Sequence, residues 1–151
     1  MSEYIASGST SGYTAPRNLK RCKSMRSEEE INAQGPLEVT GSIESGRGVN
    51  LQGDVSVRGN IDAYGNITAK GTISCHDKII GYGKLRVEGT LEGDELEIWG
   101  NLIIIGFLKC RRLVLYGSLT LIGPDSTYLV QESEEIAGAK LMRDSEADWD
   151  W

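Results

Sequence analysis

A glycine recurs every six residues in the segment "GDVSVRGNIDAYGNITAKGTIS" (53–74), and a β-branched aliphatic residue follows each glycine two places later. The pairs are Gly53 and Val55, Gly59 and Ile61, Gly65 and Ile67, and Gly71 and Ile73. This spacing excludes a helix, in which each glycine costs roughly 1 kcal/mol relative to alanine. It favours short strands that bury one side chain each and are joined by corners at which the chain needs φ > 0 or a close approach to its neighbour.

A longer period of 17–18 residues is superimposed on the six-residue one. Two columns of glycine have this spacing: Gly65, Gly83, Gly100 and Gly117, and Gly53, Gly71, Gly89, Gly106 and Gly123. Three six-residue pieces make one turn of a triangular parallel β-helix, a single-stranded solenoid in which inward-facing aliphatic residues stack from turn to turn. We expect an all-β core of about five coils over residues 37–123.

The regions on either side of this core have a different composition. Residues 1–36 are rich in Ser, Gly and Thr, followed by a basic segment, and are predicted to be a disordered tail. After Pro124 the six-residue pattern stops, and residues 124–151 carry two basic and eight acidic residues. We expect a short strand near Tyr128–Val130, a helix from about Glu132 to Met142 that is a candidate cap for the last coil, and an acidic tail.

Charge and residue content exclude several classes of function. The core carries nine basic and ten acidic residues, which does not fit a nucleic-acid surface. There is no C-x-x-C pair, and His76 is the single histidine, so no metal, cofactor or catalytic residue is expected and the chain is predicted not to be an enzyme. Cys75 and Cys110 fall two coils apart, too far for a disulfide. The N-terminus has no apolar signal segment, which predicts a cytoplasmic protein.

Short units of the form L-x-V-x-G-x-I/L carry a resemblance to a known family. They occur at 37–43, 55–61, 85–91, 96–102 and 113–119, without intervening loops. In these units the core resembles the bactofilins, which are polymer-forming cytoskeletal proteins. The resemblance implies a right-handed solenoid and a non-polar filament built from head-to-head and tail-to-tail contacts.

The open ends of such a solenoid present unpaired backbone groups above an apolar core, and edges of this kind pair with another chain unless they are blocked. We therefore predict end-to-end self-assembly into a nucleotide-independent filament, with the chain itself as partner. The predicted polymer interface consists of Leu37, Val39, Ile43, Leu113, Leu115, Leu119 and Leu121. One alternative is a capped, non-polymerising β-helix binding module that uses an exposed row of aromatic residues. A second is a hexapeptide-repeat acyltransferase, against which the order of glycine and aliphatic residues and the lack of a long loop argue.

Three further surfaces are candidates for contacts. Each column glycine from 65 to 117 follows an outward-facing aromatic residue, which predicts a surface strip of Tyr64, Tyr82, Trp99 and Tyr116. The basic residues Arg17, Lys20, Arg21, Lys23 and Arg26 are candidate contacts to an anionic membrane surface or a protein client. Ser24 and Ser27 lie in contexts that resemble kinase sites.

Overall fold

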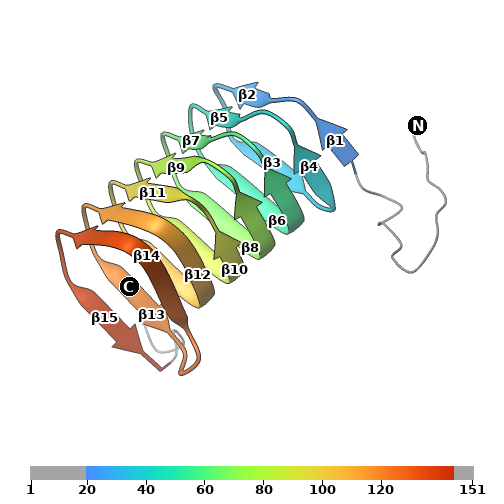
Figure 1. The fold of residues 1–151 in the computed structure, drawn as a ribbon. Coiled ribbons are helices and arrows are strands. Elements are labelled where there is room, and N and C mark those ends of the chain that lie inside the picture. Colours follow the sequence, from blue (N-terminus) through green and yellow to red (C-terminus); the bar gives the residue numbers. More distant parts are fainter. Residues whose placement is uncertain (1–19, 145–151) are drawn as a thin grey trace, which may run out of the picture.

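The computed structural model describes residues 20–144 as one parallel β-solenoid of about seven turns (Figure 1). The turns stack in chain order, so that β1 and β15 lie at opposite ends of the stack. This arrangement confirms the predicted all-β class and solenoid architecture. No helix that is long and apolar enough to cross a membrane occurs between residues 20 and 144.

Each turn has three faces. Ten of the strands are short, and each of them lies within a single face of its turn. They are β1 (Lys20–Cys22), β2 (Met25–Ser27), β3 (Ile31–Gln34), β4 (Leu37–Val39), β5 (Ile43–Ser45), β7 (Ile61–Ala63), β9 (Lys78–Gly81), β11 (Glu95–Ile98), β13 (Leu119–Ile122) and β15 (Lys140–Arg143). The other strands continue around a corner: β6 (Val49–Val57), β8 (Ile67–Cys75), β10 (Leu85–Glu92), β12 (Leu102–Leu115) and β14 (Thr127–Ile136).

The register of the parallel pairs reproduces the period found in the sequence. Val49 pairs with Ile67 and Ile67 with Leu85, each step spanning 18 residues, whereas the next step, from Leu85 to Leu102, spans 17. Side-chain hydrogen bonds across the corners have the same separations of 18 and 17 residues. The single-residue slips in the glycine columns therefore mark turns that are one residue shorter.

Inward-facing aliphatic side chains form the core. One column consists of Ile43, Ile61, Ile79, Leu96 and Leu113, and each of them is at most 1% exposed. Full burial of such a side chain stabilises the fold by roughly 1.5–3 kcal/mol, but only if the next turn covers it. Stability therefore depends on the stacking of neighbouring turns.

Glycine is required at the corner that leads from the last face of one turn to the first face of the next turn. Gly53, Gly71, Gly89, Gly106 and Gly123 have φ between 89° and 136°, a region that L side chains rarely adopt. A Cβ on Gly71 would lie 2.5 Å from the carbonyl oxygen of Gly53 in the preceding turn. Backbone conformation and close packing thus both account for this column.

The solenoid extends beyond the boundaries predicted from the sequence. An additional first turn, coil 1 (20–34), precedes residue 37, and an additional last turn, coil 7 (127–143), follows residue 123. The prediction of about five coils was therefore too low, and residues 20–36 are ordered into strands rather than a tail. Sequence patterns missed coil 1 because β1 and β2 have neither the glycine nor the aliphatic rhythm. Residues 1–19 and 145–151, which include Arg17 and most of the acidic tail, lie outside the described residues.

The helix predicted from about Glu132 to Met142 is wrong. These residues form the second half of β14 and the start of β15, which pair with β12 and β13 of the preceding turn. The open edge of that turn offers backbone hydrogen bonds that outweigh a weak local helix preference. The pairing is irregular, with a register shift between Cys110 and Arg112, and the wider loop after Gly123 lengthens this turn.

We expect Gly71→Ala to lower the free energy of unfolding by about 2–4 kcal/mol, because it adds a backbone clash to the strain of positive φ. Gly123→Ala is the matched control, since Gly123 has φ 98° but a Cβ there would meet only the Ser126 Oγ, at 3.6 Å. Urea unfolding followed by circular dichroism measures both variants. Equal losses in the two variants would contradict the role assigned to the close approach.

Candidate functional site

Four outward-facing aromatic side chains form a continuous stack across successive turns. The stack, called here the aromatic row, consists of Tyr64, Tyr82, Trp99 and Tyr116. Neighbouring ring centroids are 5.4, 6.3 and 4.2 Å apart, with interplanar angles of 13–28°. The Trp99 Nε1–H also donates a hydrogen bond to Glu97 at 2.8 Å. The row is thus a rigid surface whose inner rings cover one another.

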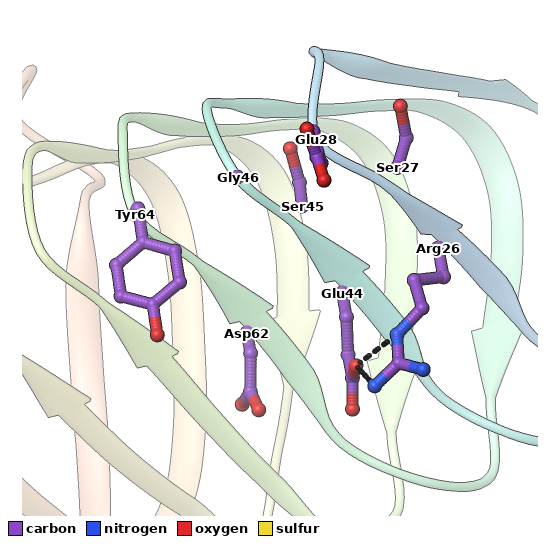
Figure 2. Close-up of a pocket in the computed structure, with 8 residues that line it drawn as sticks. All are labelled: Arg26, Ser27, Glu28, Glu44, Ser45, Gly46, Asp62 and Tyr64. Carbon is purple, nitrogen blue, oxygen red and sulfur yellow. Dashed lines mark hydrogen bonds and ion pairs between the residues drawn. The ribbon is translucent and has the colours of Figure 1, made fainter.

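An open hollow of about 840 Å³ adjoins the row at Tyr64 (Figure 2). Tyr64 is 71% exposed, against 48% for Tyr82, because the equivalent position in the preceding turn is Gly46. Glu28 follows in the turn before that. The hollow, called here the Tyr64 hollow, therefore lies across the first three turns, beside the last ring of the stack.

The Tyr64 hollow is lined by more acidic than basic side chains. Glu28, Glu44 and Asp62 contribute carboxylates, and Arg26 contributes the one guanidinium. Arg26 is already bound to Glu44 through Nε at 2.9 Å and through Nη2 at 2.8 Å. Figure 2 shows Arg26, Glu44 and Asp62 side by side on successive strands, with Tyr64 beyond Asp62.

Asp62 is held in an unfavourable environment. Its Oδ1 atom is buried and has no hydrogen-bond partner among the described residues. Burial, reinforced by the charge of Glu44, raises the pKa of the Asp62 carboxyl above its ordinary value, and Lys78 offsets part of this effect. Lys78 thus supplies a positive charge near Asp62, but no described group donates a hydrogen bond to its Oδ1 atom.

The two ends of the solenoid differ in chemistry. At the N-terminal end the inward-column positions of coil 1 are the apolar residues Cys22, Met25, Ile31 and Ala33 and the polar residues Lys20 and Ser27. Ile31 and Ala33 are only 6% and 5% exposed, whereas Lys20, at the start of β1, is exposed. Strands β1, β2 and β3 each pair with one neighbour, on the side of the second turn. Coil 1 therefore combines a largely apolar interior with strand edges that no other described strand covers.

At the C-terminal end, inward-facing positions carry a polar cluster. Tyr128, Glu134 and Lys140 pair in register with Leu108, Leu113 and Leu119 of the preceding turn. The Tyr128 hydroxyl donates to Glu134 Oε2 at 3.0 Å, and Lys140 Nζ lies 2.7 Å from the same oxygen. Lys140 also lies 5.7 Å from the centroid of the Tyr128 ring. Coil 7 thus places an ion pair over the apolar core, which is one way in which natural proteins protect a sheet edge.

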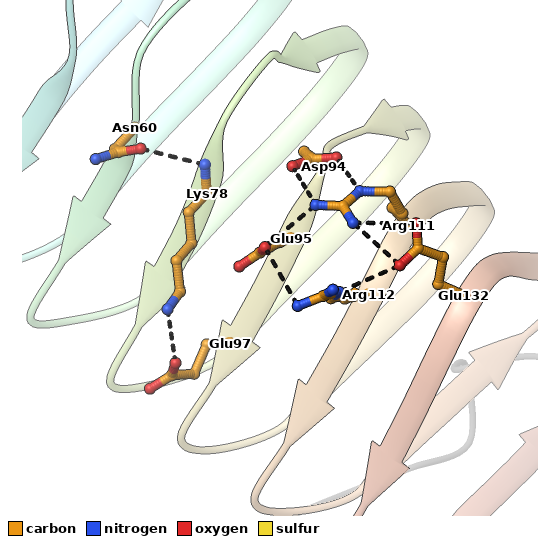
Figure 3. A network of polar contacts seen from close by, with 8 residues as sticks. All are labelled: Asn60, Lys78, Asp94, Glu95, Glu97, Arg111, Arg112 and Glu132. Atoms are coloured by element: carbon orange, nitrogen blue, oxygen red, sulfur yellow. Dashed lines mark hydrogen bonds and ion pairs between the residues drawn. The ribbon is translucent and has the colours of Figure 1, made fainter.

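A network of charged side chains attaches coil 7 to the turns before it (Figure 3). Arg111 binds Asp94 of the preceding turn in a bidentate manner, at 2.7 and 3.0 Å, and both oxygens of Glu132 in coil 7 at 3.0 Å. Arg112 lies 3.3 Å from Glu132 and 4.0 Å from Glu95. Hydrogen bonds from Arg111 lower the pKa of Asp94 and of Glu132. The network spans the register shift of β14, where backbone pairing is interrupted.

The residues predicted as the polymer interface do not lie at the ends. Leu37, Val39 and Ile43 are in the second turn beneath coil 1, and Leu113, Leu115 and Leu119 are in the sixth turn beneath coil 7. All six are buried and Leu121 is partly buried. This assignment is corrected because the solenoid has one more turn at each end.

The predicted basic segment is part of coil 1. Arg21 pairs with Glu38 at 2.9 Å and Arg26 with Glu44, whereas Lys20 and Lys23 are exposed. The hydroxyl of Ser24 accepts a hydrogen bond from Ser42 N, at 3.2 Å. The hydroxyl of Ser27 accepts one from Glu29 N, at 2.9 Å. Two of the arginines are therefore already paired within the solenoid.

The three cysteines share one inward-facing column but occupy different turns, and none forms a disulfide. Burial raises the pKa of Cys75 to about 11 and that of Cys110 to about 12, so both thiols are protonated at neutral pH. His76 is exposed at a corner. No cluster of side chains suited to a metal ion occurs among residues 20–144.

Searches with family models, curated protein sequences and solved structures gave no significant match to this chain. The site therefore has to be interpreted from its own geometry. Sequence reasoning placed the aromatic strip on the surface but missed the Tyr64 hollow. The sequence feature that could have indicated the hollow is Gly46, which occupies the position that carries an aromatic residue in each of the next four turns.

We expect Asp62→Asn to raise the free energy of unfolding at pH 7 by about 0.5 kcal/mol, because it removes the repulsion from Glu44 in a partly solvent-screened site. The pKa of Asp62 is raised in the fold, so the carboxylate destabilises the protein above that pKa and not below it. The gain should therefore shrink at pH 4. Urea titrations at both pH values, with Glu92→Gln as an exposed control, measure this. A loss of stability at pH 7 would contradict the interpretation.

We expect Glu132→Gln to lower the thermal midpoint at pH 7 and to have little effect at pH 3. The folded-state pKa of Glu132 is lowered, so its stabilisation is present above the ordinary pKa of about 4.3 and is lost as the pH falls through the folded value. Circular dichroism melts across this pH range test it, again with Glu92→Gln as control. A difference that persists at pH 3 would mean that the charge of Glu132 is not what attaches coil 7.

Proposed function

We propose that this chain is a non-catalytic scaffold protein whose solenoids join end to end into filaments, in the manner that the bactofilin resemblance implies. The observation that carries the proposal is the uncovered outer edge of coil 1. Its strands have a partner on one side only, and its inward-facing side chains are mostly apolar. A second copy brought against this end would complete the backbone pairing and cover Met25 and Cys22 at the same time.

The proposal predicts that the two ends of the solenoid bind a second copy with different affinities. Contact between two N-terminal ends buries Cys22 and Met25, and Lys20, which lies at the exposed start of β1, can keep its ammonium group in solvent. Contact between two C-terminal ends has to bury Glu134 and Lys140, and the desolvation of an ion pair offsets much of what the contact gains. We therefore expect the joint between N-terminal ends to be the stronger of the two, and particles of two solenoids to be the first species formed.

The sequence suggested that residues after Pro124 could cap the last coil. Where these residues lie helps to choose between self-assembly and a capped, non-polymerising module. Residues 127–143 do not fold across the end but add a further turn, so β15 has β13 as its single partner strand. Backbone groups at this edge remain suited to pairing. This favours self-assembly over a capped module, while the polar cluster reduces the affinity of that end.

Negative-stain electron microscopy and analytical ultracentrifugation of the full-length chain at micromolar concentration test the proposal. The wild type is expected to form filaments, and Met25→Lys is expected to give particles no longer than two solenoids, because it places a charge at the apolar joint. Thr72→Lys adds the same charge on an exposed part of the body and is the matched control. Monodisperse single solenoids of the wild type, or filaments of Met25→Lys equal to those of the wild type, would overturn the proposal.

A further inference from the structure

The aromatic row ends at a position that cannot carry a side chain. A Cβ on Gly46 would lie 2.7 Å from the carbonyl oxygen of Glu28 in coil 1, so the backbone of that turn restricts the position to glycine. The stack therefore stops at Tyr64, which has a ring neighbour at Tyr82 and none on the side of Gly46. Tyr64 is 71% exposed, against 48% for Tyr82, and its position opposite a glycine distinguishes it from Tyr116, the ring at the other end of the row, which is 41% exposed.

The groups around the gap define what would fill it. An uncovered tyrosine ring attracts a flat group, and a positive charge above the ring adds a cation–π contribution. Three carboxylates face one guanidinium, which leaves an excess of negative charge in the Tyr64 hollow. The Oδ1 atom of Asp62 has no hydrogen-bond donor among the described residues, and because this atom is buried, the carboxylate has to turn toward the hollow to accept a hydrogen bond from a ligand. A ligand that is flat, cationic and rich in donors meets all three conditions.

Of the groups that proteins present, the guanidinium of arginine has this combination. Its planar face stacks on aromatic rings, and its five N–H groups match carboxylate oxygens in a bidentate geometry. A lysine ammonium would satisfy the charge but not the stacking. A neutral sugar would stack but would leave the charge uncompensated. Arg26 shows a related contact in the same hollow, where two of its nitrogens bind one oxygen of Glu44, Oε1.

We propose that the Tyr64 hollow is a binding site for an arginine side chain of a partner protein, which stacks on Tyr64 and binds Asp62. The partner is thereby recruited to the flank of the solenoid near its N-terminal end, and not to its axial ends. The site does not require end-to-end assembly, because all of its lining residues come from one solenoid. A filament would present one such site per subunit.

Binding of fluorescein-labelled hexa-arginine and hexa-lysine to the full-length protein at 150 mM salt tests the proposal by fluorescence anisotropy. The two peptides carry the same charge, so non-specific attraction contributes equally to both. Hexa-arginine is expected to bind about fivefold more tightly than hexa-lysine, in line with a partly exposed cation–π contact. Tyr64→Leu should remove this preference, and Asp62→Asn should weaken hexa-arginine binding severalfold.

Tyr116→Leu removes a ring at the other end of the aromatic row, and Glu92→Gln removes an exposed carboxylate elsewhere. Both variants should bind as the wild type does. Equal affinity for the two peptides, or equal losses in Tyr116→Leu and Tyr64→Leu, would overturn the proposal. Binding of cellotetraose with loss in Tyr64→Leu, combined with no arginine preference, would reassign the hollow to carbohydrate. Anisotropy reports binding whether or not the chain forms filaments, so failure here is distinguishable from failure of end-to-end assembly.

Discussion

Backbone pairing between successive turns is the interaction on which the rest of this structure depends. Paired strands lie about 4.8 Å apart, and at a corner this spacing leaves no room for a side chain that points at the turn below. A Cβ on Gly83 would lie 3.0 Å from the carbonyl oxygen of Gly65, which shows how closely the corners approach. Glycine at the corners therefore permits the pairing, and the pairing in turn stacks the aliphatic core.

The stacking of turns also determines where binding surfaces can form. The corners between the described strands are short, and the candidate surfaces proposed here lie on outward-facing rows and at the two ends. Equivalent positions in neighbouring turns lie directly over one another, which converts a sequence period into a row of rings or charges. The aromatic row and the network around Arg111 both arise in this way (Figure 3). A single exception within a row, such as Gly46, then produces a local site.

The ends combine open strand edges with different side chains, and this difference gives the solenoid a direction. Coil 1 presents Cys22 and Met25 with Lys20 at its margin, whereas coil 7 carries the cluster of Tyr128, Glu134 and Lys140 beside Val130 and Ile136. The Tyr64 hollow lies on the flank of the first three turns, and its coil 1 residues Arg26, Ser27 and Glu28 border the N-terminal end. Assembly through the ends and recruitment of a partner on the flank are separate proposals for one molecule.

The sequence by itself determined the fold class, the length of a turn, the inward columns and the outward aromatic strip. These features follow from glycine and aliphatic residues at fixed spacing, and such spacing acts locally in every turn. Only the tertiary structure decided how far the solenoid extends. Residues 20–22 and 132–142 lack the pattern, yet they form strands because the edge of the adjacent turn offers hydrogen bonds to any backbone that reaches it. The Tyr64 hollow likewise required three turns to be placed side by side: the sequence marks Tyr64 as an outward-facing ring and Gly46 as a break in the row, but only the register brings Glu28 beside them.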